Sequence, residues 1–363
     1  MTLILVFFFT QSSLVLSETQ GPQGKTKKSL RQKTQKKIKR HSARTTPKKN
    51  KIHTHSKKNN RSRSVPKAKK VLAPSRLIIP AVKKESLIEI VVRSSIPVNS
   101  GSLQELVENE IIRMKAVGHL LPADQISLQV FDLNEKKILA DINGNEIRNA
   151  ASLIKLFVML AVYDSIARQE LQETPEIEHQ LYRMIAVSDN GATNYLIRRL
   201  GRGDALQGIV GINALMRKMG FTGSHLRELI PDGGKTYANQ TTAADTTLFF
   251  RLLYEQKLVS PQYSQKMNDI LLKSIHDRIR THQIKQDGVA VADKTGYVRG
   301  LNGDCGIVYL KGLDGSCHDY ILSIIIENRY RPSNRGWGKK KSVAIRYLSD
   351  RIYQNLKNGQ GKT

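Results

Sequence analysis

The chain has 363 residues, enough for two domains or one large one, and a formal net charge of +28 that is concentrated near its start. It has two cysteines, Cys305 and Cys317, and no CxxC pair of the kind that marks many metal sites. Composition therefore gives no support for a metal site, and no cofactor is expected. It permits either one disulfide or two small buried thiols.

An apolar stretch at residues 3–16 has the length of the hydrophobic region of a secretory signal peptide and is too short to span a bilayer comfortably. Val15 and Ser17 are small enough to precede a cleavage near Ser17–Glu18, although no lysine or arginine precedes the stretch. We interpret residues 1–17 as a signal peptide, with an uncleaved anchor as the alternative. The protein is therefore expected to be exported to the periplasm or the extracellular space.

Residues 21–70 contain twenty lysines and arginines and no aspartate or glutamate. A segment with almost no large apolar residues cannot bury a core, so we predict that it is disordered. Basic tails bind polyanions. Because export is expected, an anionic envelope polymer or lipid is the predicted partner, and no nucleic acid is expected. We assign residues 18–100 to this basic tail and a linker, with one candidate strand at residues 87–92.

From residue 101 the sequence has the texture of a globular domain, which we assign to residues 101–363. Apolar residues at helical spacing predict a helix over residues 103–114. Alternating apolar residues then predict a β-hairpin from strands at residues 125–131 and 137–142.

The remaining elements are mainly helical until the last strands. The sequence predicts, in chain order, a helix from Ser152, a helix-rich middle at 174–257, strands at 306–310 and 320–326 around a turn at 313–316, and a closing helix at 341–356. Strands at both ends with helices between them predict an α+β fold, an α/β sandwich. One antiparallel sheet is built from both ends of the domain, and an all-helical subdomain is inserted.

Ser152 and Lys155 open the most informative segment, because the apolar run at residues 156–162 predicts a helix that is buried on all sides. Burying the ammonium group of Lys155 is costly unless it is paired or loses its proton. A spacing of three places both residues on one helix face. A hydroxyl beside a desolvated amine can make serine a nucleophile without histidine. Alternatively, Ser152 caps the helix and Lys155 extends to solvent.

Two further motifs follow, Ser188-Asp189-Asn190 and Lys294-Thr295-Gly296. Taken alone, Ser188 or Asp189 would cap a helix at residues 192–200, and the second motif would be a solvated turn. The three motifs in this order and spacing are a specific signal.

This combination resembles the penicillin-recognising serine hydrolases, and most closely the catalytic domain of class A β-lactamases, over about residues 101–358. Further matching pieces are Ala150-Ala151, Met219-Gly220 and residues 239–243. The resemblance implies an enzyme, a monomer, that opens β-lactam rings. Two alternatives stay open. One is a D-Ala-D-Ala peptidase or penicillin-binding protein that acts on peptidoglycan stems. The other is an envelope polyanion-binding protein in which the hydrolase fold is a scaffold.

The resemblance also implies roles for the residues of the first two motifs. Ser152 would attack the carbonyl carbon and form an acyl-enzyme, and Lys155 would take its proton. Ser188 would relay a proton to the leaving nitrogen, and Asn190 would hydrogen-bond the side-chain amide of the substrate.

The third motif would bind substrate. Lys294 and Thr295 would lie on an edge strand and hold the substrate carboxylate, the lysine as a cation and the threonine as a donor. Gly296 would let the substrate approach the strand. The oxyanion hole would use the backbone N–H groups of Ser152 and Tyr297.

The sequence departs from class A enzymes where a glutamate activates the deacylating water. The corresponding loop, residues 224–237, is short, and its carboxylates are Glu228 and Asp232. Glu228 lies about two positions early and is either the base or a surface partner of Arg227. We therefore predict intact acylation and slow deacylation.

The residues around the predicted binding site for the substrate carboxylate also differ from those of class A enzymes. Tyr297 is bulky where a small residue is usual. Asp304 falls about where an arginine often supports the substrate carboxylate, although Arg299 could reach that place from the following loop.

Overall fold

The computed structural model describes residues 102–231, 235, 237–310, 318–332 and 335–359. All of them belong to one compact unit of the chain, residues 78–363. The predicted signal peptide, basic tail, strand at 87–92 and turn at 313–316 lie outside the described residues, as do Asp232 and Cys317.

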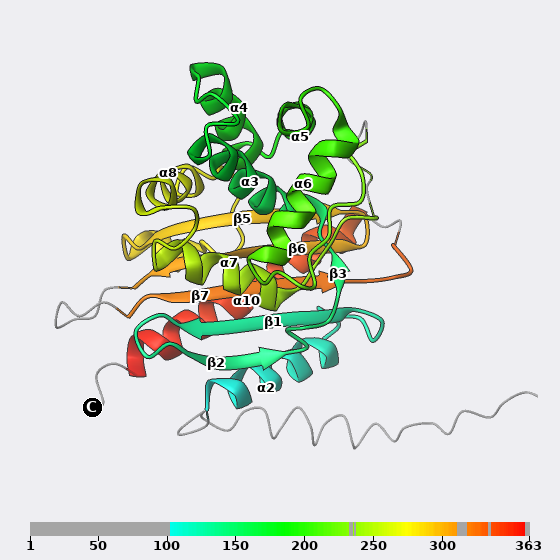
Figure 1. Cartoon of the computed structure of the whole chain (residues 1–363). Coiled ribbons are helices and arrows are strands. Elements are labelled where there is room, and N and C mark those ends of the chain that lie inside the picture. Colours follow the sequence, from blue (N-terminus) through cyan, green and yellow to red (C-terminus); the bar gives the residue numbers. More distant parts are fainter. Residues whose placement is uncertain (1–101, 232–234, 236, 311–317, 333–334, 360–363) are drawn as a thin grey trace, which may run out of the picture. The chain divides into compact units, whose positions relative to one another are not determined.

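The centre of this unit is a five-stranded antiparallel sheet in the order β2-β1-β7-β6-β5 (Figure 1). Its strands are β1 (Gln125–Asp132), β2 (Lys137–Ile142), β5 (Ala290–Val298), β6 (Leu301–Tyr309) and β7 (Tyr320–Glu327). The last strand, β7, pairs with the first strand, β1, from Gln125↔Glu327 to Asp132↔Tyr320. The predicted α+β fold with a sheet closed by both ends of the domain is therefore confirmed.

Strand β6 begins at Leu301, five residues before the strand that the sequence predicts at 306–310. Its first half contains Asn302, Gly303 and Asp304, small or polar residues with low β-strand propensity. They are buried nevertheless, because the middle of a sheet covered on both faces buries every residue.

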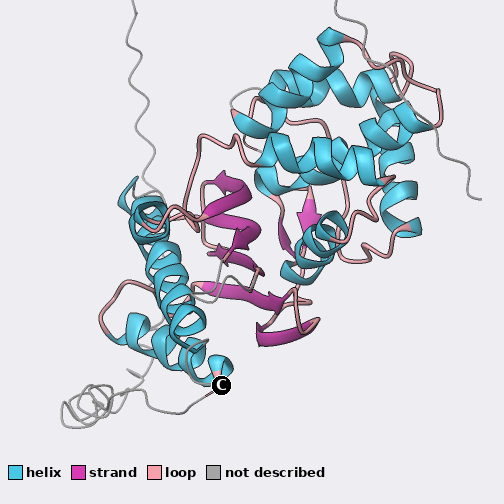
Figure 2. Ribbon diagram, turned by 90° about the vertical axis from the view of Figure 1, so that its left-hand side faces the viewer, coloured by secondary structure: helices cyan, strands magenta, loops and turns pink. Residues whose placement is uncertain are grey.

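Helices cover both faces of the sheet, which Figure 2 shows from the side. On one face pack α2 (Leu103–Ala116), α9 (His282–Gln286) and α10 (Arg335–Gly359). The other face carries the inserted helices α3 (Lys155–Ala167), α4 (Pro175–Ala186), α5 (Asn190–Leu200), α6 (Ala205–Lys218), α7 (Ala243–Tyr254) and α8 (Pro261–Leu271). A short second sheet pairs β3 (Arg148–Asn149) with β4 (Gln240–Thr241). Within the described residues, no helix is both long and apolar enough to cross a membrane.

Helix α3 is the centre of the inserted helical part. Eleven of its thirteen residues, from Lys155 to Ile166, are buried, as its apolar sequence predicts. Since α3 is surrounded by other elements, its first turn is held rigidly against the sheet, and the predicted site lies at this end.

Candidate active site

Ser152 lies in a 3-10 turn, Ala151–Ile154, directly before α3. The preceding Ala151 has φ 43°, the left-handed region, which costs energy for a residue with a Cβ. Three hydrogen bonds hold this backbone: Ala151 N–H to Asn149 Oδ1 at 2.8 Å, Ala150 N–H to the Asn239 carbonyl at 2.8 Å, and Leu153 N–H to the Ala150 carbonyl at 2.9 Å. The turn therefore presents Ser152 in one orientation. Ser152 caps neither helix, so the capping alternative is wrong.

Lys155 is the first residue of α3 and is fully buried. Its Nζ donates to the Ser188 carbonyl at 2.6 Å and to Asn190 Oδ1 at 2.8 Å, and lies 3.3 Å from Ser188 Oγ. The alternative of a solvated lysine is therefore wrong. Desolvation, followed by the charge of Lys294, lowers the pKa of Lys155 well below its ordinary value, although Asp189 opposes this. Burial thus favours a neutral amine that can accept a proton.

Ser188 lies between α4 and α5 and also has a left-handed backbone, φ 61°. Asp189 next to it caps α5, since its Oδ1 accepts from the Ala192 N–H at 2.7 Å. Its other oxygen forms an ion pair with Arg183 at 2.6 Å. The helix begins at Asn190, two residues earlier than predicted. The cap fixes the backbone that carries Ser188 and Asn190.

Lys294 lies on β5, an edge strand as predicted, and is fully buried. Its Nζ donates to Ser188 Oγ at 3.1 Å and to the Thr295 carbonyl at 2.9 Å. The Ser188 hydroxyl oxygen therefore faces two lysine amines, one from α3 and one from β5. Because both lysines donate to the Ser188 oxygen, the Ser188 hydroxyl can direct its own proton toward a substrate. This arrangement suits a group that relays a proton.

We expect the rate of acylation by benzylpenicillin to be bell-shaped in pH. On the acid side the rate rises as Lys155 loses its proton, because only the neutral amine can accept the proton of Ser152. On the alkaline side the rate falls near pH 8, because burial lowers the pKa of Lys294 to about 8 and a neutral Lys294 no longer attracts the substrate carboxylate. Acylation rates measured across pH test this. Lys294→Arg, which stays protonated, should abolish the alkaline fall, and an unchanged fall would contradict the assignment.

Gly296 packs β5 against the turn that carries Ser152. A Cβ at this position would lie 2.9 Å from Leu153 Cγ and 3.2 Å from the Ala150 carbonyl oxygen. The sequence interpretation gave Gly296 the task of admitting substrate. The structure shows that a side chain here would push the edge strand away from the Ser152 turn.

Tyr297 has its ring beside the first turns of α10, where a Cβ on Gly338 would lie 2.7 Å from Tyr297 Cε2. The side chain is 54% exposed. Because residues alternate across a strand, Tyr297 faces away from the side on which Gly296 meets Leu153. The bulky residue therefore leaves the Ser152 turn unobstructed.

Thr295 pairs with Asp304 on β6. The buried Asp304 carboxyl group accepts from the backbone N–H groups of Arg278 and Ile279 at 3.0 and 2.9 Å, so it anchors this segment to the sheet. An acid cannot supply the positive charge that an arginine would bring to the substrate carboxylate. Arg299 does not reach Thr295 either, because its Nε donates to the Arg331 carbonyl at 2.8 Å.

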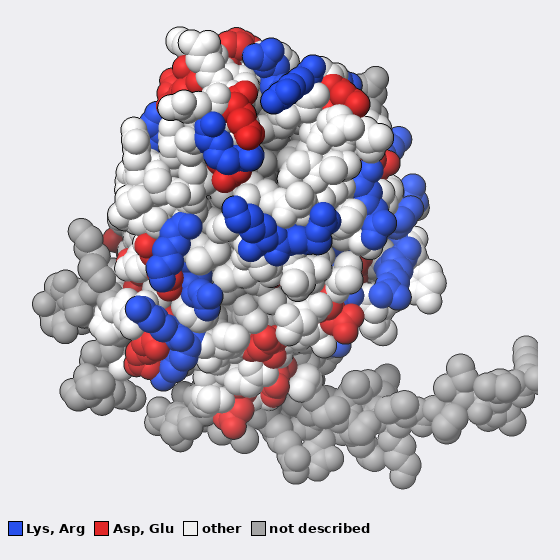
Figure 3. All heavy atoms as spheres, in the orientation of Figure 1, with Lys and Arg blue, Asp and Glu red and all other residues white. Residues whose placement is uncertain are grey.

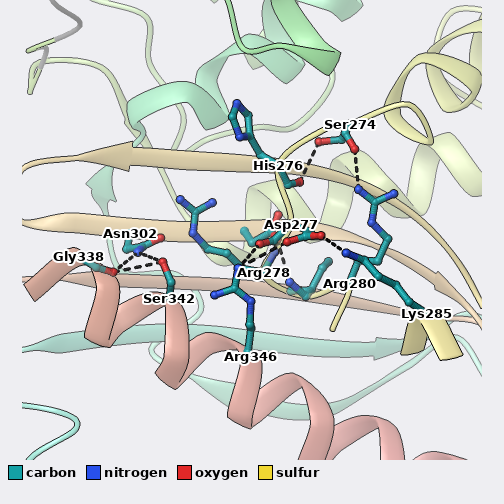
Figure 4. A network of polar contacts seen from close by, with 12 residues as sticks. Ser274, His276, Asp277, Arg278, Arg280, Lys285, Asn302, Gly338, Ser342 and Arg346 are labelled. Atoms are coloured by element: carbon teal, nitrogen blue, oxygen red, sulfur yellow. Dashed lines mark hydrogen bonds and ion pairs between the residues drawn. The ribbon is translucent and has the colours of Figure 1, made fainter. Parts of the chain in front are cut away.

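A third residue near Thr295, Arg278, carries a positive charge that the sequence analysis did not identify. Its guanidinium is mostly buried and is attracted to Asp304 and to Asp293, the residue before Lys294. Figure 4 shows it against the sheet, within the polar network that also contains Asp277 and Arg346. No motif marks it in the sequence. Its segment is tied to Asp304 on β6, the residue that pairs with Thr295 on β5.

The loop with Glu228 is held by asparagine side chains, each of which bonds the loop backbone. Asn213 exchanges two hydrogen bonds with Leu226, and Asn194 exchanges two with Ile230. Asn239 Oδ1 accepts from the Arg227 and Glu228 N–H groups at 2.8 and 3.1 Å. The loop is short but has a defined register.

Glu228 is half-buried in this loop. The Arg227 guanidinium donates to Gln240 Oε1, at 3.0 Å for its closer contact. Asp189 raises the pKa of Lys155, against the larger effect of desolvation. The role of Glu228 as a deacylation base stays a prediction.

Cys305, on β6, is a buried free thiol, and burial raises its pKa to about 12. Because Cys317 lies outside the described residues, the choice between a disulfide and two thiols stays open. No group of three or more potential metal ligands (His, Cys, Asp or Glu) occurs among the described residues.

A five-stranded antiparallel sheet with an inserted helical part and a serine turn at the start of a buried helix defines the fold of the penicillin-recognising serine hydrolases. The family model described as the β-lactamase enzyme family matches residues 113–180 and 171–356. The chain belongs to this family. No curated protein matches it.

Solved structures share the fold at low sequence identity. PBP-A is 22% identical with a TM-score of 0.57, over 70% of this chain and 96% of that one. A β-lactamase from Sphaerobacter thermophilus DSM 20745 is 22% identical with a TM-score of 0.56, over 69% and 96%. A class A β-lactamase from Bacteroides cellulosilyticus DSM 14838 is 18% identical with a TM-score of 0.56, over 71% and 100%.

Proposed function

We propose that the protein is a serine hydrolase that opens β-lactam rings through an acyl-enzyme on Ser152. The observation that carries the proposal is the convergence of Lys155 and Lys294 on Ser188 Oγ, at 3.3 and 3.1 Å, beside the rigid turn of Ser152. These groups come from a helix, a loop and an edge strand that are far apart in the sequence.

The proposed reaction uses these groups in turn. Neutral Lys155 takes the proton of Ser152 while Oγ forms a bond to the lactam carbonyl carbon. The carbon–nitrogen bond of the ring then breaks, and the nitrogen receives a proton through Ser188. Asn190 already accepts from Lys155 through Oδ1, so its Nδ2 can donate to a carbonyl of the substrate side chain.

The substrate would be oriented by the edge strand. Lys294 and Thr295 would hold its carboxylate, and the N–H groups of Ser152 and Tyr297 would stabilise the oxyanion. The similar structure of PBP-A has been determined as an acyl-enzyme with penicillin G, in a variant in which glutamate replaces a leucine. That complex supports a β-lactam site in this fold.

We expect a chromogenic cephalosporin to give a stoichiometric burst followed by slow turnover. Lys155 is the proposed general base for acylation. Loss of a general base for deacylation would slow that step by about 10²–10⁴-fold. Burst amplitude and steady-state rate, measured on purified protein, test this, and no burst would contradict the proposed function. Turnover as fast as that of an efficient β-lactamase would instead refute slow deacylation.

Glu228→Gln then asks whether Glu228 is the deacylation base. A steady rate that falls by about a hundredfold with an unchanged burst would assign this role to Glu228. We expect little change, as for the control Glu176→Gln, an exposed glutamate on α4.

Slow deacylation favours a second candidate, a D-Ala-D-Ala peptidase or penicillin-binding protein that acts on peptidoglycan stems. The observation behind it is the match to the solved structures of PBP-A, one of which is an acyl-enzyme with penicillin G. The scaffold alternative, with polyanion binding as the sole function, is disfavoured because both lysines meet at the Ser188 hydroxyl, and Lys155 begins the helix that follows the Ser152 turn.

We also propose export and attachment to an anionic envelope polymer or lipid through residues 21–70. Their twenty positive charges carry this proposal. Deletion of residues 21–70 should leave the burst unchanged and weaken retention on envelope fractions. Retention of the parent should fall as salt is raised. Equal retention of both proteins would refute the proposal.

A further inference from the structure

A cleft of about 250 Å³ lies between the β5–β6 turn and the loop that follows β7. Its walls include Tyr237, Arg299, Glu327, Arg329 and Arg331. The three arginines are exposed. Figure 3 shows Lys and Arg side chains gathered on the right-hand side of the view, where Figure 1 places these ends of the sheet.

The loop after β7 is held by Asn328, which is buried and donates to Asp124 Oδ1 at 2.7 Å. The N–H of Asn328 donates to the Gly300 carbonyl at 2.7 Å. Gly300 has φ +84°, and a Cβ there would lie 2.9 Å from Arg331 Cα, so glycine allows the turn and the loop to meet.

The arginines of the cleft are placed by specific contacts. Arg331 has a left-handed backbone, φ 46°, and its guanidinium stacks on Tyr237 at 3.6 Å from the ring centroid. Arg299 is joined to the Arg331 carbonyl through Nε. Glu327 interacts with the buried Arg148, so its charge is partly offset. The cleft is therefore positively charged, and specific contacts fix the positions of two of its arginines.

The direction of β5 indicates where the cleft lies relative to a substrate bound at Ser152. This argument rests on the proposed function. A substrate along β5 has its carboxylate at Lys294 and Thr295 and its reacting carbonyl at the N–H of Tyr297. Its acyl portion then continues toward Arg299. At about 3.3 Å per residue, the cleft begins about 7–10 Å beyond the reacting carbonyl. Two or three residues of an extended acyl group span this distance.

We propose that this arginine cleft binds a carboxylate on the acyl portion of a peptide substrate, two to three residues before the bond that Ser152 attacks. Guanidinium groups bind carboxylates through directed, charge-assisted hydrogen bonds. A small penicillin side chain does not reach the cleft, whereas a peptidoglycan stem with an acidic residue does. The cleft thus selects acidic peptides as acyl donors.

The test uses two penicillins with the same peptide side chain, which ends in a carboxylate in one and a carboxamide in the other. The side chain places this group about 7–10 Å beyond its amide carbonyl. The readout is the ratio of the two second-order rate constants for acylation of Ser152. We expect a preference for the carboxylate of about fivefold to tenfold at low salt, falling toward one at high salt because screening weakens attraction between exposed charges.

The double variant Arg299→Gln/Arg331→Gln should bring the ratio close to one. Arg198→Gln, an exposed arginine on α5, is the matched control and should keep the parental ratio. A parental ratio of one, or a ratio unchanged in the double variant, would overturn the inference even if both penicillins label Ser152. Labelling by neither would refute the proposed function itself. The salt dependence of the parent provides a test that needs no variant.

Discussion

Ser152→Ala is expected to abolish covalent labelling by a fluorescent penicillin and to leave the fold intact. The substitution removes the hydroxyl that is proposed to attack the carbonyl carbon. Ser152 is only half-buried and caps no helix, so the thermal midpoint should stay close to that of the parent. Labelling is read from a denaturing gel or by mass spectrometry of the intact protein.

The matched control for this experiment is Ser165→Ala, which removes a hydroxyl from a buried position on α3. The control should label like the parent. Labelling of the Ser152 variant at the parental level would show that another residue is attacked.

Lys155→Met is expected to slow acylation by about 10²–10⁴-fold, the usual contribution of a general base. Methionine keeps most of the volume of the side chain and removes the amine. Removing the amine leaves the Ser188 carbonyl and Asn190 Oδ1 without the donor that they have in the parent, at a cost of about 1–3 kcal/mol. Stability should therefore fall moderately, while the rate of acylation falls by orders of magnitude. Stopped-flow acylation and thermal unfolding of the same preparation separate the two effects.

Lys155→Ala provides the comparison. It should lose the same catalytic factor and in addition about 2–5 kcal/mol of stability from the cavity, by analogy with large-to-small changes in cores. The two variants should acylate at similar rates. If Lys155→Met acylates at the parental rate, the base lies elsewhere.

Lys155 and Ser188 show which part of the site could be predicted from the sequence and which part could not. The apolar run after Lys155 required a buried helix, and burial of an ammonium group already implied an altered protonation state. That reasoning is local. The contact of Lys155 with Ser188 spans 33 residues and that of Lys294 with the same oxygen spans 106. Motif order suggested these contacts through a family resemblance, but spacing along the chain does not determine them.

Gly296, Tyr297 and Arg278 show what local reasoning could not supply. The role of Gly296 toward substrate stays a prediction, and the structure adds that this residue packs on Leu153. Tyr297 was noted as bulky for its position, and the structure places its ring beside α10. Arg278 carried no motif. Each outcome depends on which face of β5 a residue occupies and on what packs there.

The sequence by itself therefore determined the class of the fold, the buried helix α3 and the cap of α5. The reason is that periodicity and short caps act between near neighbours in the chain. The tertiary structure decided which groups meet at Ser188 Oγ, which arginine lies beneath β5 and where the arginine cleft opens. The physical reason is that strand register and helix packing bring together groups far apart in the chain. A one-residue change in register would send every side chain of β5 to the opposite face.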